Sequence, residues 1–153
     1  MLNELFVIIS NFYFINFIEY VIHKFSHNPK YGGIFYKYHH KHHTIDYPPN
    51  RLTVKILKED TTLPIIILIL NIYLIIYLII PRYYFYIISI ESVSYIYVMN
   101  LFHDHYHLID SPFDKYEWFM KKKLLHHKHH IKTTKNLNLA FNITDNFFNT
   151  YLE

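Results

Sequence analysis

Residues 63–80 read Leu-Pro-Ile-Ile-Ile-Leu-Ile-Leu-Asn-Ile-Tyr-Leu-Ile-Ile-Tyr-Leu-Ile-Ile, an apolar run without a charged side chain. A helix of this length extends about 27 Å, close to the hydrocarbon thickness of a bilayer. Pro81 and Arg82 follow, and a second apolar run occupies residues 83–102. The two runs predict a transmembrane hairpin with a tight turn. Two buried helices of a soluble protein are the alternative, which such a long uncharged run disfavours.

A third apolar segment, residues 5–22, is also long enough to span a bilayer. It lacks a basic leading region and a small-residue cleavage site, so we interpret it as a retained anchor and not as a signal peptide. Because Asn11, Asn16 and Glu19 make it less apolar than a lipid-bathed helix, we expect one face to pack on protein. The expected fold class is all-α, an integral membrane protein with about three transmembrane helices. The length predicts a single domain over residues 1–153.

The charged residues are concentrated in two polar segments. Of the 15 lysines and arginines, seven lie in residues 23–60 and seven in residues 103–153. The positive-inside rule therefore predicts that both segments are cytoplasmic, where they form a histidine-rich helical cap. The run 121–123, three lysines, is interpreted as part of this topology signal and not as a nucleic-acid site. Glu91 is costly in lipid, so we expect it to face the helix bundle and bond to an Asn or Ser of a neighbouring helix.

The histidines form four groups, and their spacing indicates metal binding. There are 13 histidines and no cysteine, so a metal ion would be held by nitrogen and oxygen ligands. Residues three and four apart share a helix face. Ten histidines have this spacing: His23, His27, His39, His42, His43, His103, His107, His126, His129 and His130. His40, His105 and His127 fall off these faces, although His39, His40 and His43 would also make a partial face.

We expect each group to present its imidazoles toward one point. One ion takes four to six ligands, so ten imidazoles suit two adjacent ions with open positions. Imidazole binds iron, zinc and copper alike, so spacing does not identify the metal. A single His-x3-His pair is weak, and a histidine-rich tract can be merely compositional. Two triplets and two pairs, each next to an apolar helix end, make chance a poor explanation.

This pattern of four boxes resembles the fatty acid hydroxylase and sterol desaturase superfamily, and within it the fatty acid 2-hydroxylases. Residues 19–27, Glu-Tyr-Val-Ile-His-Lys-Phe-Ser-His, are similar to the first box, and Arg51-Leu52 follow the second box at the family distance. The tail from residue 136 to residue 150 is similar to the closing family motif. Asn138 and Asn149 there replace two glycines, and Asn tolerates a left-handed backbone better than other non-glycine residues.

The resemblance implies a di-iron centre, with zinc an alternative in the isolated protein, that uses O2 to hydroxylate a lipid acyl chain. The implied position is C2 of a fatty acid or sphingolipid N-acyl chain. Electrons would come from a separate donor such as cytochrome b5 and its reductase, and the location would be the endoplasmic reticulum. Glu19, Asp46 and Asp104 are candidate acceptors for imidazole N–H groups.

Some features depart from the 2-hydroxylase pattern. Met99-Asn100 replace the usual Tyr-Asp before the third box, three spans replace four, and no fused cytochrome b5 domain is expected. A sterol oxidase or desaturase of the same superfamily is therefore an alternative. So is a membrane protein that binds metal without catalysis.

Overall fold

The computed structural model describes residues 2–58 and 63–153, and the side chains outside residues 59–67. Residues 59 and 60 of the expected polar segment lie outside the described residues. The elements in chain order are α1 (Leu2–Ser26), α2 (Gly33–Lys41), the π-helix η1 (His42–Asp46), α3 (Leu63–Ile79), α4 (Arg82–Tyr106), α5 (Glu117–Ile131) and α6 (Ile143–Phe147). Among the described residues, the β-type pairing consists of one isolated parallel bridge between Val54 and Leu108. The expectation of an all-α fold is confirmed.

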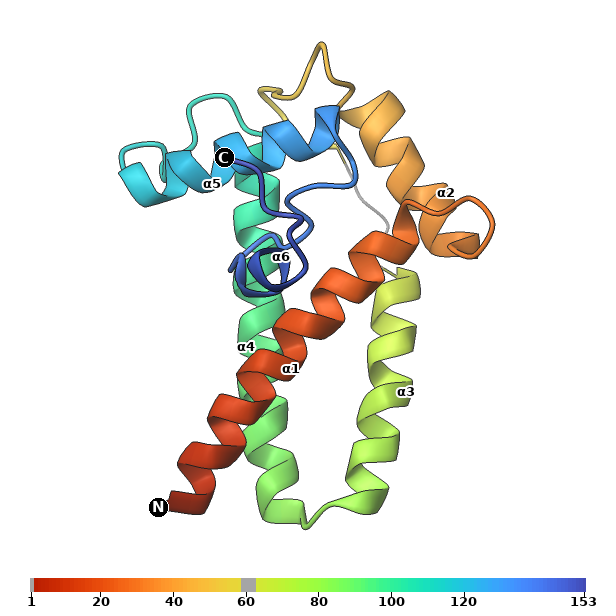
Figure 1. Cartoon of the computed structure of the whole chain (residues 1–153), viewed down its shortest axis with the longest axis vertical. Coiled ribbons are helices and arrows are strands. Elements are labelled where there is room, and N and C mark those ends of the chain that lie inside the picture. The colour runs from red at the N-terminus through yellow and green to blue at the C-terminus, as the bar shows by residue number, and fades with distance from the viewer. Residues whose placement is uncertain (1, 59–62) are drawn as a thin grey trace.

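Three long helices form one body, and the smaller elements gather at one end of it (Figure 1). α3 and α4 run antiparallel with Pro81 in the turn between them, and α1 crosses against α4. α1 and α4 have 25 residues each and are long and apolar enough to cross a membrane. α3 has 17 residues, and its stretch Leu68–Ile79 is a shorter apolar helix. The expected spans thus coincide with helices, and two of them meet the length for crossing.

Polar side chains join α1 to α4 inside the apolar body. Asn11 donates from Nδ2 to Glu91 Oε2 at 2.9 Å, and Asn16 donates from Nδ2 to the Tyr95 hydroxyl at 3.1 Å. Asn16 has no exposed surface. These contacts confirm that one face of α1 packs on protein and that Glu91 bonds to an Asn of a neighbouring helix.

A sharp turn after α1 returns the chain so that α2 packs beside it. The Asn28 side chain accepts from the backbone N–H of Lys30 at 2.9 Å, an arrangement typical of an Asx turn. A Cβ at Gly32 would lie 2.5 Å from the carbonyl oxygen of Phe25, so no larger residue fits. Gly33 has a φ of 53°, which glycine adopts without steric cost. The turn therefore brings the histidines of α2 back to the end of α1.

The C-terminal tail contains α6, and this helix packs against α1. Asn136 and Asn149 have φ values of 53° and 55°, so both are left-handed. The prediction for Asn149 is confirmed, whereas Asn138 is not among the left-handed residues. Asn138 instead uses its side chain, donating from Nδ2 to the Asn16 carbonyl at 2.9 Å and accepting from the Asp145 N–H at 3.1 Å. Its role in the tail is to cross-link and not to supply backbone freedom.

The three lysines of α5 are engaged within the protein. Lys123 is 7% exposed and pairs with Asp114 at 2.9 Å. Lys122 donates to the Asn142 side chain, and burial lowers the pKa of Lys122 to about 8. Lys121 pairs with the exposed Glu153. The three lysines therefore contribute packing and ion pairs to the cap, in addition to the role in membrane topology that the sequence predicts.

Candidate metal centre

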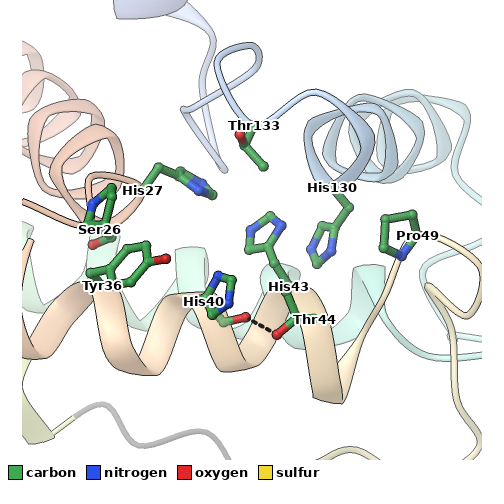
Figure 2. Close-up of a pocket in the computed structure, with 10 residues that line it drawn as sticks. Ser26, His27, Tyr36, His40, His43, Thr44, Pro49, His130 and Thr133 are labelled. Carbon is green, nitrogen blue, oxygen red and sulfur yellow. Dashed lines mark hydrogen bonds between the residues drawn. The ribbon is translucent and has the colours of Figure 1, made fainter.

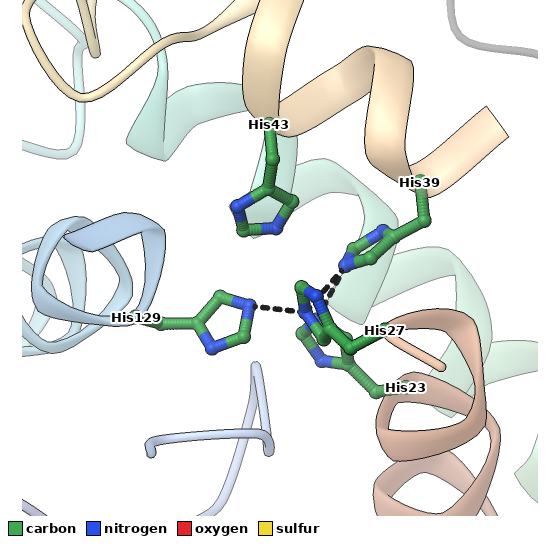
Figure 3. A group of neighbouring side chains, drawn as sticks. All are labelled: His23, His27, His39, His43 and His129. Carbon is green, nitrogen blue, oxygen red and sulfur yellow. Dashed lines mark hydrogen bonds between the residues drawn. The ribbon is translucent and has the colours of Figure 1, made fainter. Parts of the chain in front are cut away.

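Nine of the ten predicted histidines come together in two neighbouring clusters. The first cluster, shown in Figure 3, contains His23, His27, His39, His43 and His129. The second cluster contains His42, His107, His126 and His130. Within each cluster the candidate ligand nitrogens all lie within 4.8 Å of one another. The end of α1, the α2–η1 segment, the end of α4 and α5 all contribute, so only the folded chain assembles these clusters.

Each histidine triplet is divided between the two clusters. His39 and His43 belong to the first cluster and His42 to the second, so the expectation that a triplet converges on one point is wrong. The reason is that adjacent side chains on a helix diverge by about 100°. The π-helix also begins at His42, whose carbonyl accepts from the Tyr47 N–H at 2.9 Å. Such π-turns frequently occur at functional sites.

The triplet of α5 is divided in the complementary way. His129 belongs to the first cluster, and His126 and His130 belong to the second. The rings of His43 and His130 stack across the boundary with centroids 3.9 Å apart. The two clusters are therefore direct neighbours, as two adjacent ions would require.

His103, the tenth predicted ligand, lies beside the second cluster without belonging to it by distance. Its ring centroid is 4.8 Å from those of His42 and His126 and 5.2 Å from that of His107.

Backbone carbonyls fix the orientation of four imidazoles through Nδ1. The pairs are His23 with Leu137 at 2.5 Å, His129 with Lys135 at 2.7 Å, His107 with Leu52 at 2.7 Å and His130 with Tyr47 at 2.9 Å. A carbonyl oxygen only accepts, so each of these Nδ1 atoms carries the proton. The Nε2 atom of each ring is then the unprotonated atom and is free to bind a metal ion. Such an N–H bond to the protein is typical of metal-binding histidines.

The Nε2 atoms approach one another more closely than neutral imidazoles favour. In the second cluster, His126 Nε2 lies 2.9 Å from His107 Nε2 and 3.1 Å from His130 Nε2. The latter two atoms are unprotonated, and one proton on His126 can be donated to only one of them. Nitrogens bound at about 2.1 Å lie about 3 Å apart around a six-coordinate ion and about 3.4 Å apart around a tetrahedral one, so a shared six-coordinate cation fits this spacing.

The first cluster shows the same close approach. His39 Nε2 lies 3.0 Å from His23 Nε2 and 2.9 Å from His27 Nε2, and His27 Nε2 lies 3.0 Å from His129 Nε2. Both ring nitrogens of His43 are buried with no hydrogen-bond partner in the described part of the chain. An unsatisfied buried polar atom costs about 1–3 kcal/mol. A cation bound by these nitrogens would remove this cost.

Several imidazoles of the two clusters are held neutral. Burial, followed by the neighbouring imidazoles, lowers the pKa values of His39, His126 and His129 well below the usual range. Burial also lowers the pKa of His27 to about 4. Neutral imidazole offers the lone pair that a metal requires. The donor set, its protonation and its spacing therefore all fit metal ions.

The three histidines predicted to lie off the shared faces have other partners. His40 is exposed and stacks on Tyr36, with ring centroids 5.1 Å apart. His105 Nδ1 lies 2.9 Å from Ser111 Oγ, and His127 donates from Nε2 to the Tyr106 carbonyl at 2.8 Å. The alternative face containing His40 is therefore not the one that the structure forms.

Two of the three predicted acidic partners of the imidazoles, Glu19 and Asp46, bond to other groups, and for Asp104 this role stays a prediction. Glu19 accepts from the Tyr95 hydroxyl at 2.6 Å and from the Leu139 N–H at 2.5 Å. Asp46 pairs with Lys41 at 2.7 Å, and Asp104 is exposed on α4. The acceptors that orient the imidazoles are backbone carbonyls, for which the sequence carries no direct signal.

Asp145 holds the tail segment that supplies two of these carbonyls. It has no exposed surface, and its carboxylate accepts from the N–H of Leu137 at 2.9 Å and of Asn138 at 2.7 Å. It also accepts from Thr150 Oγ1 at 2.7 Å. The fixed segment carries the Leu137 carbonyl, which accepts from His23. Asp145 is thus a positioning residue for the first cluster, signalled in the sequence only by its place in the tail motif.

An apolar cavity of about 540 Å³ lies between α1, α3 and α4. One end is lined by imidazoles of both clusters, His23, His39 and His42, together with His103. The walls are mostly apolar and aromatic side chains, among which isoleucine is the most frequent. A second pocket of about 300 Å³, lined by cap residues that include His27, His43 and His130, also reaches the clusters (Figure 2). The clusters are thus accessible both from the apolar body and from the cap.

The chain has the features of a helical membrane protein with a candidate two-metal centre of imidazole ligands. These features are the long apolar helices, the two histidine clusters and the apolar cavity beside them. The sequence model of the fatty acid hydroxylase family matches residues 8–150, and the chain belongs to this family. Membership implies an oxidoreductase that acts on lipids, and it confirms the superfamily named from the sequence. No curated protein and no solved structure shows a significant match to the chain.

Proposed function

We propose that the chain is a di-metal membrane hydroxylase that uses O2 to insert one oxygen atom into a C–H bond of a lipid acyl chain. C2 of a fatty acid or of a sphingolipid N-acyl chain is the proposed position. The observation that carries this proposal is the cavity between α1, α3 and α4, which ends at imidazoles of both clusters. An acyl chain is the ligand whose shape and polarity suit such a cavity.

The protein's own residues bind and position the chain. Ile15, Ile18 and Ile22 of α1 and Ile69 and Ile72 of α3 line the cavity and favour hydrocarbon over water. The chain would enter from the bilayer, where it is already dissolved, and its reacting carbon would lie at the imidazole end. Excluding water from this end also protects the oxidising chemistry from side reactions.

The two clusters, with His103 added to the second, would hold two iron ions, and zinc is the alternative in the isolated protein. The bound metal pair supplies the O2-dependent oxidation of the C–H bond. The carbonyls of Leu137, Lys135, Leu52 and Tyr47 keep the Nε2 atoms directed inward. Electrons come from a separate donor such as cytochrome b5 and its reductase.

For the topology we propose three spans, with α3 as the third, and a cytoplasmic cap in the endoplasmic reticulum membrane. The end of α1, the start of α3 and the end of α4 all point toward the cap (Figure 1). The basic residues flank the helices at this end, which supports the orientation. Every histidine cluster then lies on the same side as a cytoplasmic electron donor.

Lipid profiling of cells with and without the protein tests the function. We expect 2-hydroxylated acyl lipids to appear, and to be absent with His42→Ala and with His129→Ala, while both variants still insert into membranes. His40→Ala, a change at an exposed histidine outside both clusters, is the matched control and retains activity. Activity retained by either cluster variant contradicts the assignment.

Two other functions give different results in the same experiments. A sterol oxidase or desaturase alters sterols and leaves acyl lipids unchanged. A metal-binding protein without catalysis takes up metal ions but does not consume O2. The cavity beside the clusters favours the acyl-chain hydroxylase.

A further inference from the structure

The histidine clusters have a second opening, which lies on the cap. The pocket of about 300 Å³ in Figure 2 is lined by residues of two segments, 26–49 and 130–133. It includes His27 and His43 of the first cluster and His130 of the second. Other imidazoles of the same two clusters line the apolar cavity. An acyl chain in that cavity therefore leaves the cap side of the clusters open.

The pocket connects the surface of the cap with the clusters over a short distance. Pro29, Thr44 and Pro49 line it and are exposed, whereas His43 and His130 line it and are buried. Thr44 directly follows His43, and consecutive Cα atoms are about 3.8 Å apart. A molecule bound at the mouth therefore lies close to ligands of both clusters without entering the protein.

The surface around the mouth is basic. The two lining segments contain four lysines and one acidic residue. Each lysine is adjacent in the chain to a residue that lines the pocket, and all four are exposed: Lys30, Lys37, Lys41 and Lys132. We call these four lysines the basic rim. The acidic residue, Asp46, is 5% exposed and pairs with Lys41, so the mouth presents a net positive charge.

The charge and the position of the basic rim indicate what binds there. Opposite charges steer two proteins together and orient them. Resting on the proposed function, we infer that the basic rim binds an acidic electron-donor protein, whose redox group then lies over the mouth of the pocket. Exposed charges give an association that weakens with salt, and fast dissociation suits a donor that leaves after each electron.

The proposed reaction requires such a donor. Inserting one atom of O2 into a C–H bond leaves the other atom to be reduced to water, which takes up two electrons and two protons. A haem protein that carries one electron therefore docks twice in each turnover, and the protons come from water. Because the acyl chain occupies the opposite opening, the donor and the substrate bind at the same time without competing.

The test uses the full-length protein in detergent, loaded with iron, and two haem-protein probes of opposite charge. The cytochrome b5 haem domain is the acidic probe, and cytochrome c is the basic one. One readout is binding, and the other is the rate at which the reduced haem is oxidised. For the wild type we expect binding of the acidic probe only. We also expect this binding to weaken as salt rises from about 0.01 M to about 0.1 M, where the Debye length falls from about 30 Å to about 10 Å.

Charge reversal at the rim exchanges the preferred probe. Lys37→Glu with Lys132→Glu lowers the affinity for the acidic probe by about tenfold at low salt and introduces binding of the basic probe, a gain that misfolding does not produce. Lys115→Glu is the matched control and binds as the wild type does. Lys115 is exposed and precedes α5, whereas Lys132 follows it, and the 15 residues of α5 extend about 22 Å.

The outcomes separate this inference from the proposed function. Equal binding of the acidic probe by the wild type and the double variant overturns the inference. So does rim-dependent binding of phosphatidylserine vesicles without binding of the acidic probe, because the rim is then a lipid-headgroup surface. If rim-dependent docking and haem oxidation occur but no lipid is hydroxylated, the proposed function fails and the basic rim stands. If the double variant hydroxylates lipid at the wild-type rate with limiting donor, the function stands and the basic rim fails.

Discussion

Asp145→Asn tests how the tail organises the first histidine cluster. The buried carboxylate accepts from Leu137 N–H, Asn138 N–H and Thr150 Oγ1. Asparagine keeps one acceptor oxygen and places an NH2 group where the other oxygen was. At that position a charge-assisted hydrogen bond is lost, because the NH2 group and the group that donated to the oxygen are both donors. Bonds to a charged group contribute about 1.5–3 kcal/mol each, so we expect a loss of about 2–4 kcal/mol in the free energy of unfolding. This corresponds to a decrease of roughly 5–15 °C in the thermal midpoint.

The same change weakens metal binding at one cluster. The Leu137 carbonyl that accepts from His23 belongs to the segment that Asp145 holds, whereas the carbonyls of Leu52 and Tyr47, which orient the second cluster, do not. Loss of such an outer partner lowers metal affinity by about 10–100-fold. We therefore expect titration with a chelator to remove one ion from Asp145→Asn at a lower concentration than from the wild type, and the other ion at the same concentration.

The control for this prediction is Asp110→Asn. Asp110 is exposed and has a φ of 58°, a conformation that asparagine also tolerates, so neither stability nor metal affinity changes. Thermal unfolding in detergent and metal analysis measure both quantities. If Asp145→Asn retains the wild-type thermal midpoint and releases both ions together, the reasoning is refuted.

Three further predictions concern the cap. The metal-free protein loses stability as the pH falls below about 6.5. The reason is that imidazoles such as His27, whose pKa in the folded protein is about 4, are protonated at a higher pH in the unfolded chain. A thermal midpoint that does not change from pH 7.5 to pH 4.5 contradicts this. Asn149→Gly leaves the thermal midpoint nearly unchanged, whereas Asn149→Val lowers stability by about 1–2 kcal/mol, since its φ is 55°. Lys123→Met lowers stability by about 1–3 kcal/mol because it leaves Asp114 without its cation, and adding Asp114→Asn recovers part of this loss in chemical denaturation.

The sequence predicts much of the fold because its signals are local. Long apolar runs determine where α1, α3 and α4 lie, and Pro81 marks the turn between the last two. Helical spacing also selects the nine histidines that come together, with His103 beside them, and leaves out His40, His105 and His127, because side-chain direction within a helix depends mainly on sequence separation.

Features that depend on tertiary structure are not predicted. The division of each triplet between two clusters depends on how α2 and α5 face each other and on the π-helix at His42. The acceptors for the imidazole N–H groups are backbone carbonyls such as that of Leu137, and any residue type provides one. Glu19 has the right spacing from His23 for such a role, yet its carboxylate bonds to Tyr95 and the tail.

Metal analysis of three variants tests the central claim, that two adjacent metal sites share each histidine triplet. The wild-type protein is expected to bind two ions per chain, and His40→Ala also two. His42→Ala and His43→Ala change neighbouring residues that belong to different clusters, so each is expected to lose a different ion and retain the other. One ion per chain in the wild type, or loss of the same ion in both variants, would contradict the account.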